Sequence, residues 1–352
     1  MRRRPKQVNA KDAAIEEGRF IPERLIARIR DEDEIVNDVR HTETWPVLDY
    51  EQWAATAAAL HRWSQILGKV RLAFTPWFNH SWHVPLYVTD SGLSTSPIYA
   101  DDLAFQLELD LVRHRCVTRL PGRERHFALE SMSVARFYTD LMADLHEEGI
   151  DALIVRMPNE IPDCVPFDVD HEVRPYDAEA TRRFLRVLQS IDRQFKWFRT
   201  GFLGKSSPVH FFWGSFDLAV TRFSGRRAPP HPGGIPGLPD EVTREAYSHE
   251  EASVGFWPGD ARYPKAAFYA YAYPSPDGIE ELTIEPSAAR FDPSLGEMIL
   301  DYEDVRTAVD PAAMLMTFLL SSFEAFAKRG GWDRSLDSPL GEPRRPRMVH
   351  QP

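Results

Sequence analysis

The sequence predicts an α+β fold in which long amphipathic helices pack on largely antiparallel sheets. Three observations support this prediction. Several stretches repeat apolar side chains every three or four residues, which is typical of helices that face a core. Short runs rich in β-branched and aromatic residues are separated by turn signals. These helices and strands do not alternate strictly, as they would around a parallel sheet, so antiparallel pairing is favoured.

The first half of the folded body spans residues 45–150 and contains two predicted helices around a set of short strands. Each helix begins at a residue suited to cap it and ends at a glycine. Asp49 and Gly68 bound the first of them. In chain order, the predicted elements are a helix over 49–69, two strands within 82–98 joined at Asp90-Ser91-Gly92, two or three strands within 105–129, and a helix over 131–149.

The second half, residues 151–332, follows a loosely similar plan. Its clearest element is the helix capped by Asp177, in which apolar residues recur at helical spacing. In both halves a helix ends in Gly-Lys before a histidine-containing strand pair, which indicates either a duplication or a chance resemblance. In chain order, the predicted elements are a strand over 151–158, a helix over 177–202, a hairpin over 206–221, a Gly/Pro-rich loop over 225–240 placed to act as a lid, strands within 246–259 and 266–274, and a helix over 310–331.

Composition and charge exclude several classes of protein. The chain has 352 residues, a formal net charge of −11 and two cysteines, Cys116 and Cys164. The acidic balance argues against a nucleic acid or an anionic membrane as partner, because both require a basic face. The cysteine count argues against a disulfide framework or a cysteine zinc site. With no secretory signal and no apolar run long enough to span a membrane, the sequence predicts a soluble, cytoplasmic protein.

The two ends of the chain are expected to lie outside the core. Residues 1–44 are rich in acidic and basic side chains and poor in large apolar ones, which predicts a flexible arm. Residues 333–352 are rich in proline and arginine, which predicts a disordered tail. The folded body is therefore expected to be a single domain of residues 45–332.

The letters Gly-Lys-Ser at residues 204–206 suggest a phosphate-binding loop, but the motif fails. A Walker loop has a glycine five positions earlier, and here that position is Arg199. A strand before the loop and a helix after it are also missing. Lys205 and Ser206 could still bind an anionic group of a ligand, and so could Arg222. The alternative is a helix C-terminus followed by a solvated lysine.

Residues 206–221 are predicted to form a hairpin with its turn at Gly214-Ser215. In that register His210 and Asp217 are diagonal neighbours on one face of the strand pair. A carboxylate beside an imidazole orients the ring and raises its basicity. This pair is therefore our candidate for acid–base catalysis. The alternative is a buried pair that only satisfies its own hydrogen bonds.

Histidines near two other predicted strands extend the candidate site. Imidazole and carboxylate groups are ligands for Zn, Fe and Mn, so a divalent metal cofactor is one hypothesis. The spacing matches no standard zinc signature. The candidate residues are, for catalysis, His210, Asp217, His83 and His249; for ligand binding, Lys205, Ser206, Arg222, Trp213 and Tyr247; and for a metal, His80, His83, His210, His249 and Glu250.

Two further polar groups are interpreted as solvated surface. His61, Gln65 and Lys69 lie four residues apart on the first helix, as they would on an exposed face, with the wall of a cleft as the alternative. The loop over residues 159–172 carries five acidic side chains, but their spacing does not match a calcium-binding loop.

Four longer motifs resemble an uncharacterised bacterial family, a domain of unknown function. The motifs are LHRWSQILGKVRL, NHSWHVPLYVT, GKSSPVHFFWGSFDLAVTRFSG and YSHE, and the resemblance covers residues 45–332. It implies a single-domain protein whose first forty or so residues are an extension outside the family pattern. It carries no activity and no catalytic residue over to this chain.

The residues favour an enzyme that acts on a small, partly apolar or aromatic molecule. The chemistry would use a His–Asp pair or a histidine-bound metal in an aromatic-lined pocket. Two alternatives stay open: a non-catalytic protein that binds a small ligand, and a structural or interaction module whose histidines belong to the core. The expected partner is a small molecule rather than a nucleic acid or a membrane.

Overall fold

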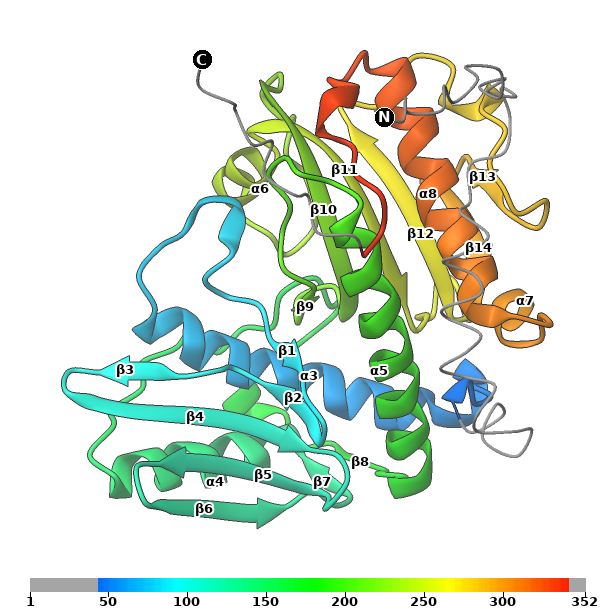
Figure 1. The fold of residues 1–352 in the computed structure, drawn as a ribbon. Helices are drawn as coiled ribbons and strands as arrows, with labels where there is room; N and C mark the ends of the chain where they lie inside the picture. Colours follow the sequence, from blue (N-terminus) through cyan, green and yellow to red (C-terminus); the bar gives the residue numbers. More distant parts are fainter. Residues whose placement is uncertain (1–43, 342–352) are drawn as a thin grey trace, which may run out of the picture. The chain divides into compact units, whose positions relative to one another are not determined.

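Antiparallel pairing dominates the computed structural model, which describes residues 44–341. Most of the arm predicted for residues 1–44, namely residues 1–43, and the end of the predicted tail, residues 342–352, lie outside the described residues. Within the described range every strand pair is antiparallel, and long helices cover the sheets, so the predicted α+β class is confirmed (Figure 1).

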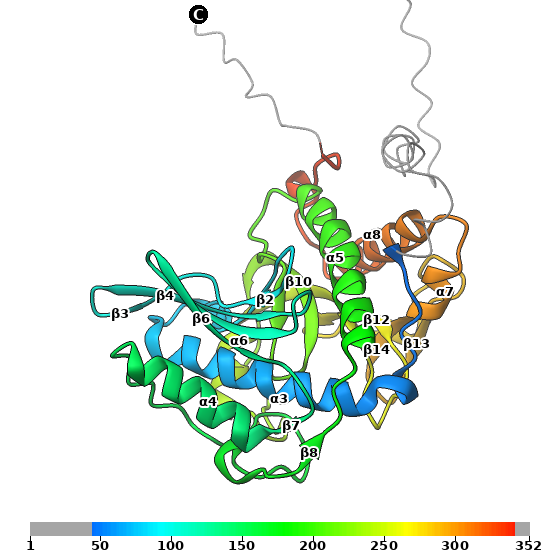
Figure 2. The same cartoon turned by 90° about the horizontal axis from the view of Figure 1, so that it is seen from below.

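The N-terminal sheet has the strand order β1-β2-β4-β5-β6, with β3 paired to β4. Helices α3 (Tyr50–Phe74) and α4 (Val134–Glu147) lie against it and against each other, as Figure 2 shows. The predicted turn near Gly92 and the strands within 105–129 are confirmed. The strands are β1 (Tyr87–Val88), β2 (Gly92–Ser94), β3 (Ile98–Ala100), β4 (Leu103–Asp110), β5 (Arg115–Leu120) and β6 (Arg123–Ala128).

Helix α3 begins as predicted but ends later. The side chain of Asp49 caps it by accepting a hydrogen bond from the backbone N–H of Glu51. The helix runs through Gly68 to Phe74, so the prediction that Gly68 ends it is wrong. This glycine instead makes room for a ring, because a Cβ added there would lie 2.1 Å from the indole of Trp213.

The C-terminal sheet has the order β13-β14-β12-β11-β10-β9. Helices α5 (Ala178–Thr200) and α8 (Pro311–Arg329) cover one of its faces, as Figure 1 shows. Both begin at a capping aspartate, Asp177 and Asp310, as predicted. Their apolar stripes form the core with the sheet. The strands are β9 (His210–Phe212), β10 (Asp217–Arg227), β11 (His249–Trp257), β12 (Ala267–Tyr273), β13 (Arg290–Asp292) and β14 (Glu297–Asp301).

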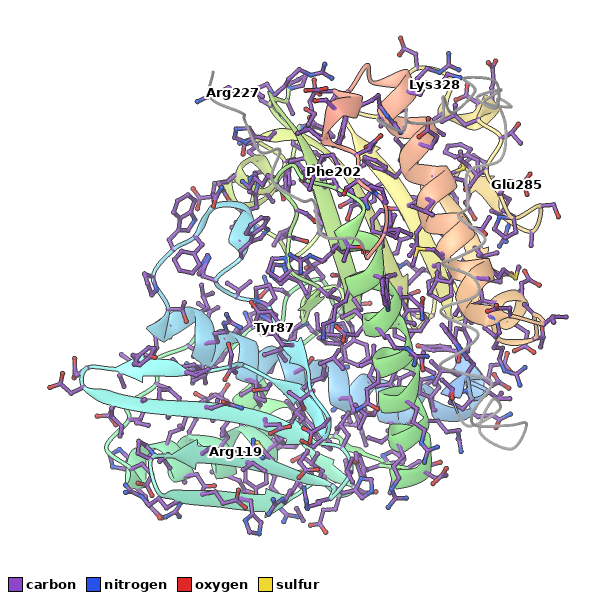
Figure 3. The ribbon with its side chains drawn as sticks, in the orientation of Figure 1. Tyr87, Arg119, Phe202, Arg227, Glu285 and Lys328 are labelled. Carbon is purple, nitrogen blue, oxygen red and sulfur yellow. The ribbon has the colours of Figure 1, made fainter. Side chains whose placement is uncertain are left out.

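The two large sheets meet at one bridge. Leu86, just before β1, and Phe211 in β9 exchange both backbone hydrogen bonds at 2.9 Å. Figure 3 shows Tyr87 beside this junction and Arg227 at the far end of β10. The end of the loop between α3 and β1 therefore pairs with β9, the edge strand of the C-terminal sheet.

Residues 151–158 are not the predicted strand. The segment has no strand partner, and Leu153 and Val155 are 89% and 72% exposed. Its apolar side chains face outward and Pro158 follows, so neither burial nor a ladder holds a strand there. Within the described part of the chain, the one backbone–backbone hydrogen bond between residues 151–158 and another segment runs from the Phe167 N–H to the Arg156 carbonyl, at 2.9 Å.

The packed part of the chain extends beyond Trp332. The carbonyl of Leu336 accepts a hydrogen bond from the backbone N–H of Leu203 at 2.7 Å, and that of Gly201 accepts one from Ser338 at 3.1 Å. Residues 333–341, assigned by sequence to the tail, thus close the end of α5.

The remaining elements are short and lie between the larger ones. Within residues 44–341, no helix combines the length and the apolar composition that a membrane-spanning helix needs. The short elements are η1 (Asn79–Ser81), β7 (Met132–Ser133), η2 (Phe167–Val169), β8 (Val173–Arg174), α6 (Asp240–Ala246), η3 (Ile279–Glu281), α7 (Tyr302–Arg306) and η4 (Arg334–Leu336).

Candidate functional site

The face of the C-terminal sheet opposite α5 and α8 carries many polar side chains. Because side chains alternate along a strand, every second residue of β10, β11 and β12 points to this side. Pairing brings these residues into three rows across the strands. We call this surface the tyrosine face, and its rows are Ala219–Gly255–Tyr269, Thr221–Ser253–Tyr271 and Phe223–Glu251–Tyr273.

Asp217 lies at one end of the tyrosine face and is 6% exposed. Its carboxylate accepts hydrogen bonds from the hydroxyls of Ser215 and Tyr269. Tyr269 reaches it by crossing Gly255, where an added Cβ would lie 2.2 Å from the tyrosine ring. Burial raises the pKa of Asp217, and the two hydroxyl donors oppose that rise.

Two more carboxyls lie near Asp217. Glu160 extends over the turn at Gly214, and Glu297 belongs to the neighbouring strand β14. Burial, together with the charge of Asp217, raises the pKa of each to about 7. Neither carboxyl has a hydrogen bond or ion pair with any residue in the range 44–341.

Glu251 lies in the third row of the tyrosine face and is 5% exposed. Burial raises its pKa to about 8, against the opposing charge of Lys205. Its carboxyl also has no hydrogen-bond or ion-pair partner among the described residues. Its two oxygens are not among the unpartnered polar atoms that are fully shut off from solvent, so water or a ligand can reach them.

His80 lies against the same row, with its ring 4.5 Å from the ring of Phe223. Its Nδ1 is 2.8 Å from the carbonyl oxygen of Ala246, which can only accept, so Nδ1 carries the proton of the neutral ring. Nε2 then keeps a free lone pair, and this atom is buried without a partner in the described part of the chain. Burial lowers the pKa of His80, which favours this neutral form.

The backbone at His80 is held in an uncommon conformation. His80 and Ser81 have φ values of 58° and 55°, a region that non-glycine residues rarely occupy. Both carboxylate oxygens of Glu245 accept a hydrogen bond from the His80 backbone N–H, at 2.9 and 2.8 Å. Helix α6 thus fixes both the backbone and the ring of His80. Strain of this kind concentrates at functional sites.

Lys205 is the cation of this region. Its Nζ lies 5.0 Å from the ring centre of Trp82 and 4.9 Å from that of Phe223, in cation–π contact with both. No carboxylate of residues 44–341 forms an ion pair with it. The ammonium is therefore positioned by rings, and its predicted role in ligand binding stays a prediction. The hydroxyl of Ser206, beside it, donates to the Ser207 carbonyl.

The predicted register of the β9–β10 hairpin is confirmed: Asp217 pairs with Phe212 and Ala219 with His210. The turn is four residues long rather than two, and Phe216 closes it with its N–H on the Phe212 carbonyl. His210 and Asp217 do not form a hydrogen bond. Diagonal neighbours in a sheet are far apart, and the carboxylate is already engaged by two hydroxyls.

His210 is instead surrounded by aromatic rings and is 1% exposed. Ring centres of Trp82, Tyr87 and Phe212 lie 5.5 to 5.9 Å from its own. Both ring nitrogens lack a partner within the described residues, and burial lowers the pKa to about 3. The structure therefore places His210 as a neutral ring.

The five predicted metal ligands are not gathered at one point. His80 and His249 are close, with ring centres 5.5 Å apart, but Glu250 points to the other side of β11 and bonds Ser224 and Arg226. His83 lies in the loop before β1, not on the strand, and its Nδ1 accepts from the Phe78 N–H. Within residues 44–341, no three histidine, cysteine or acidic side chains are grouped to hold a metal ion.

The other three predicted binding residues lie in three different places. Tyr247 lies on the tyrosine face, where its hydroxyl is 3.1 Å from that of Tyr271. Arg222 points to the opposite face, where it stacks on Phe198 and donates to its carbonyl, so it is not near Lys205's ammonium. Trp213 covers Gly68 and donates its indole N–H to the Val84 carbonyl at 2.8 Å, which joins the two sheets.

The interpretation of His61, Gln65 and Lys69 as a solvated stripe is wrong. Gln65 and Lys69 are buried, and His61 contacts the carbonyl oxygen of Gly214 at 2.8 Å. The stripe binds the loop that starts at Asn159, through Gln65 and Lys69. The adjacent acidic loop is solvated only in part, because Glu160 is half-buried.

Glu251, Glu297 and Tyr269 were not singled out from the sequence, and Glu160 was considered only as part of the acidic loop. A signal was present: β12 reads Tyr-Ala-Tyr-Ala-Tyr, so three tyrosines must share one face of a strand. Glu251 and Ser253 alternate in the same way on β11. Glu160 and Glu297 lie far apart in the chain and give no local signal.

A model of a family of unknown function (DUF5996) matches residues 45–338. The chain belongs to the DUF5996 family. The match ends within the segment that closes α5, and it covers the tyrosine face completely. No curated protein and no solved structure matches the chain.

Proposed function

We propose that this DUF5996 protein is an enzyme that acts by acid–base catalysis on a small, partly apolar or aromatic molecule bound at the tyrosine face. One observation carries the proposal. The carboxyl of Glu251 is 5% exposed and has no hydrogen-bond partner within residues 44–341. Its oxygens are not fully shut off from solvent, so a ligand bound at the tyrosine face can reach the carboxyl and complete its hydrogen bonds.

Two groups around Phe223 are suited to proton transfer. Glu251 lies directly opposite Phe223, and with a pKa of about 8 it is mostly protonated at neutral pH, as a general acid must be. His80 contacts the same ring and presents the free lone pair of Nε2, as a general base must. The proposal assigns proton transfer to this pair rather than to His210 and Asp217.

The same surroundings suggest the character of the ligand. Trp82 and Phe223 provide flat apolar surfaces, and Lys205 holds an unpaired ammonium over both rings. A carboxylate or phosphate on the ligand would complete that ion pair. The hypothesis of a Zn, Fe or Mn cofactor finds no support in the arrangement of the predicted ligands.

Binding is tested by ligand-observed NMR with benzoate as the probe and benzamide as its uncharged counterpart. We expect benzoate to bind more tightly than benzamide, and Lys205→Met to weaken benzoate binding by about tenfold. Lys265→Met, which removes an exposed lysine elsewhere, is the matched control. Equal binding of the two probes would contradict the role of Lys205.

Catalysis is tested by following the incorporation of solvent deuterium into phenylpyruvate by proton NMR. Glu251→Gln should lower the rate above background by about 10²–10⁴-fold, the usual contribution of a general acid or base. Glu250→Gln is the control, because that neighbour points to the other face. Binding of the probes without any catalysed exchange would indicate a non-catalytic binding protein instead.

A further inference from the structure

Lys69 is a buried lysine that the proposed acid–base chemistry does not use. It lies near the end of α3 and is 5% exposed, one of only seven lysines in the chain. Lysine is among the residues least often buried, and a buried lysine is normally paired with a carboxylate. No carboxylate within residues 44–341 forms an ion pair with Lys69.

Aromatic rings surround the amine instead. Its Nζ lies 5.6 Å from the ring centre of Trp213 and 6.0 Å from that of Phe167. Trp213 can approach this closely because the preceding residue on the helix is Gly68, where any side chain would collide with the indole. The local sequence therefore builds a largely apolar environment around a single amino group.

The one hydrogen bond of the amine goes to the Oδ1 of Asn159, at 2.5 Å. That contact is not needed to hold the loop. Gln65 already bonds both backbone groups of Asn159, at 2.7 and 2.8 Å, and the Asn159 amide donates to the Gly237 carbonyl at 2.7 Å. A purely structural role would thus be redundant, which leaves the amine available for chemistry.

Burial also changes the protonation of the amine. It lowers the pKa of Lys69 to about 8, and the ionisable group that opposes this change is the thiol of Cys164. At pH 7.5 about a quarter of the Lys69 side chains are then neutral, against about one in a thousand for an ordinary lysine. Only the neutral amine is a nucleophile.

We propose that Lys69 is a carbonyl-reactive site, at which the amine condenses with an aldehyde or ketone of a small molecule to form an imine. The proposal rests on the burial, the missing carboxylate and the ring contacts of Lys69, and it is independent of the function proposed for the tyrosine face. The loop around the amine is at the surface, with Pro162 and Asp163 exposed and Cys164 half-buried. We expect a small carbonyl compound to reach the amine from the side of this loop.

The reaction balances without a further reactant. The lone pair of the neutral Nζ attacks the carbonyl carbon and forms the C–N bond. The carbonyl oxygen takes up a proton, giving a carbinolamine, and the amine nitrogen loses one. Loss of the hydroxyl group as water leaves the C=N double bond. The Asn159 Oδ1, which accepts a hydrogen bond from Nζ, is positioned to orient the attacking amine.

The test is lysine-resolved trapping on the intact, full-length protein. Propanal and sodium cyanoborohydride are added at pH 7.5, and propylation at each of the seven lysines is followed by peptide mass spectrometry. We expect Lys69 to react at least about tenfold faster than Lys196 and Lys265, which are surface lysines. Its rate should level off above pH 8, whereas theirs continue to rise.

Lys69→Arg provides the matched variant, because it keeps the charge and a donor for Asn159 but cannot form an imine. It should remove the fast phase and leave the slow labelling of the other lysines unchanged. Labelling of Lys69 that is no faster than that of Lys196 in the folded wild-type protein would overturn the proposal. That result would leave the role of Glu251 unaffected, since the two sites share no group.

Discussion

Replacing Glu251 with glutamine should change how the stability of the protein depends on pH. Burial raises the pKa of this carboxyl from 4.5 to about 8, so the folded state holds its proton more tightly than the unfolded state does. Stability therefore falls as pH rises through the interval between these two values. Each pKa unit corresponds to about 1.4 kcal/mol, so the full loss is about 5 kcal/mol, reached above pH 8.

The assay is chemical denaturation of wild type and Glu251→Gln at pH 5.5, 7 and 9, followed by the fluorescence of the nine tryptophans. Linkage predicts that the loss from Glu251 is much larger at pH 9 than at pH 5.5, because the first pH lies above both pKa values and the second lies near the lower one. Because glutamine does not titrate, the stability difference between the two proteins should shift by about 3 kcal/mol over this range. The variant should be relatively more stable at high pH.

The other titrating groups cancel in this difference as long as the substitution leaves their pKa values unchanged. Glu250→Gln, on the other face of the same strand, controls for loss of a carboxylate as such. Parallel stability curves for wild type and Glu251→Gln would refute the reasoning. They would show that the Glu251 carboxyl has a partner in solution that returns its pKa to the usual range.

Three further substitutions test the packing of the site by the same denaturation assay. Gly255→Ala should cost about 1–3 kcal/mol, because the new Cβ collides with the ring of Tyr269, and an unchanged midpoint would contradict that contact. Tyr269→Phe should cost about 1–3 kcal/mol at pH 8, since buried Asp217 loses a donor; equal stability would mean that the hydroxyl is replaceable. Gly68→Ala should also cost about 1–3 kcal/mol and change tryptophan emission as Trp213 is displaced, and neither effect should be seen if the indole lies elsewhere.

Local patterns in the sequence were sufficient to predict most of the helices and several strands. The spacing of apolar residues after Asp177 and Asp310 marks α5 and α8, because a helix that packs on a sheet needs one continuous apolar stripe. The β9–β10 register was likewise predictable, since a short turn fixes which residues oppose each other. These features depend only on neighbours in the chain.

The features that were missed depend on contacts between distant segments. Gly68 has the sequence signature of a helix end, but its role is set by Trp213, 145 residues later. The strand predicted at residues 151–158 has suitable residues and no partner. His210 and Asp217 do lie on one face, yet the Asp217 carboxylate accepts a hydrogen bond from Tyr269, on a third strand. A pattern within a single segment does not predict which side chain from a distant segment will contact a given residue.

The backbone contacts of Leu336 and Ser338 with the end of α5 have a practical consequence for shortening the chain. A truncation at Trp332 would remove both hydrogen bonds and the side chain of Leu340, which packs against Gly201. The guanidinium of Arg222, which is 1% exposed and stacked on Phe198, would then lie closer to water. Truncated versions of the chain should therefore keep all residues up to Gly341.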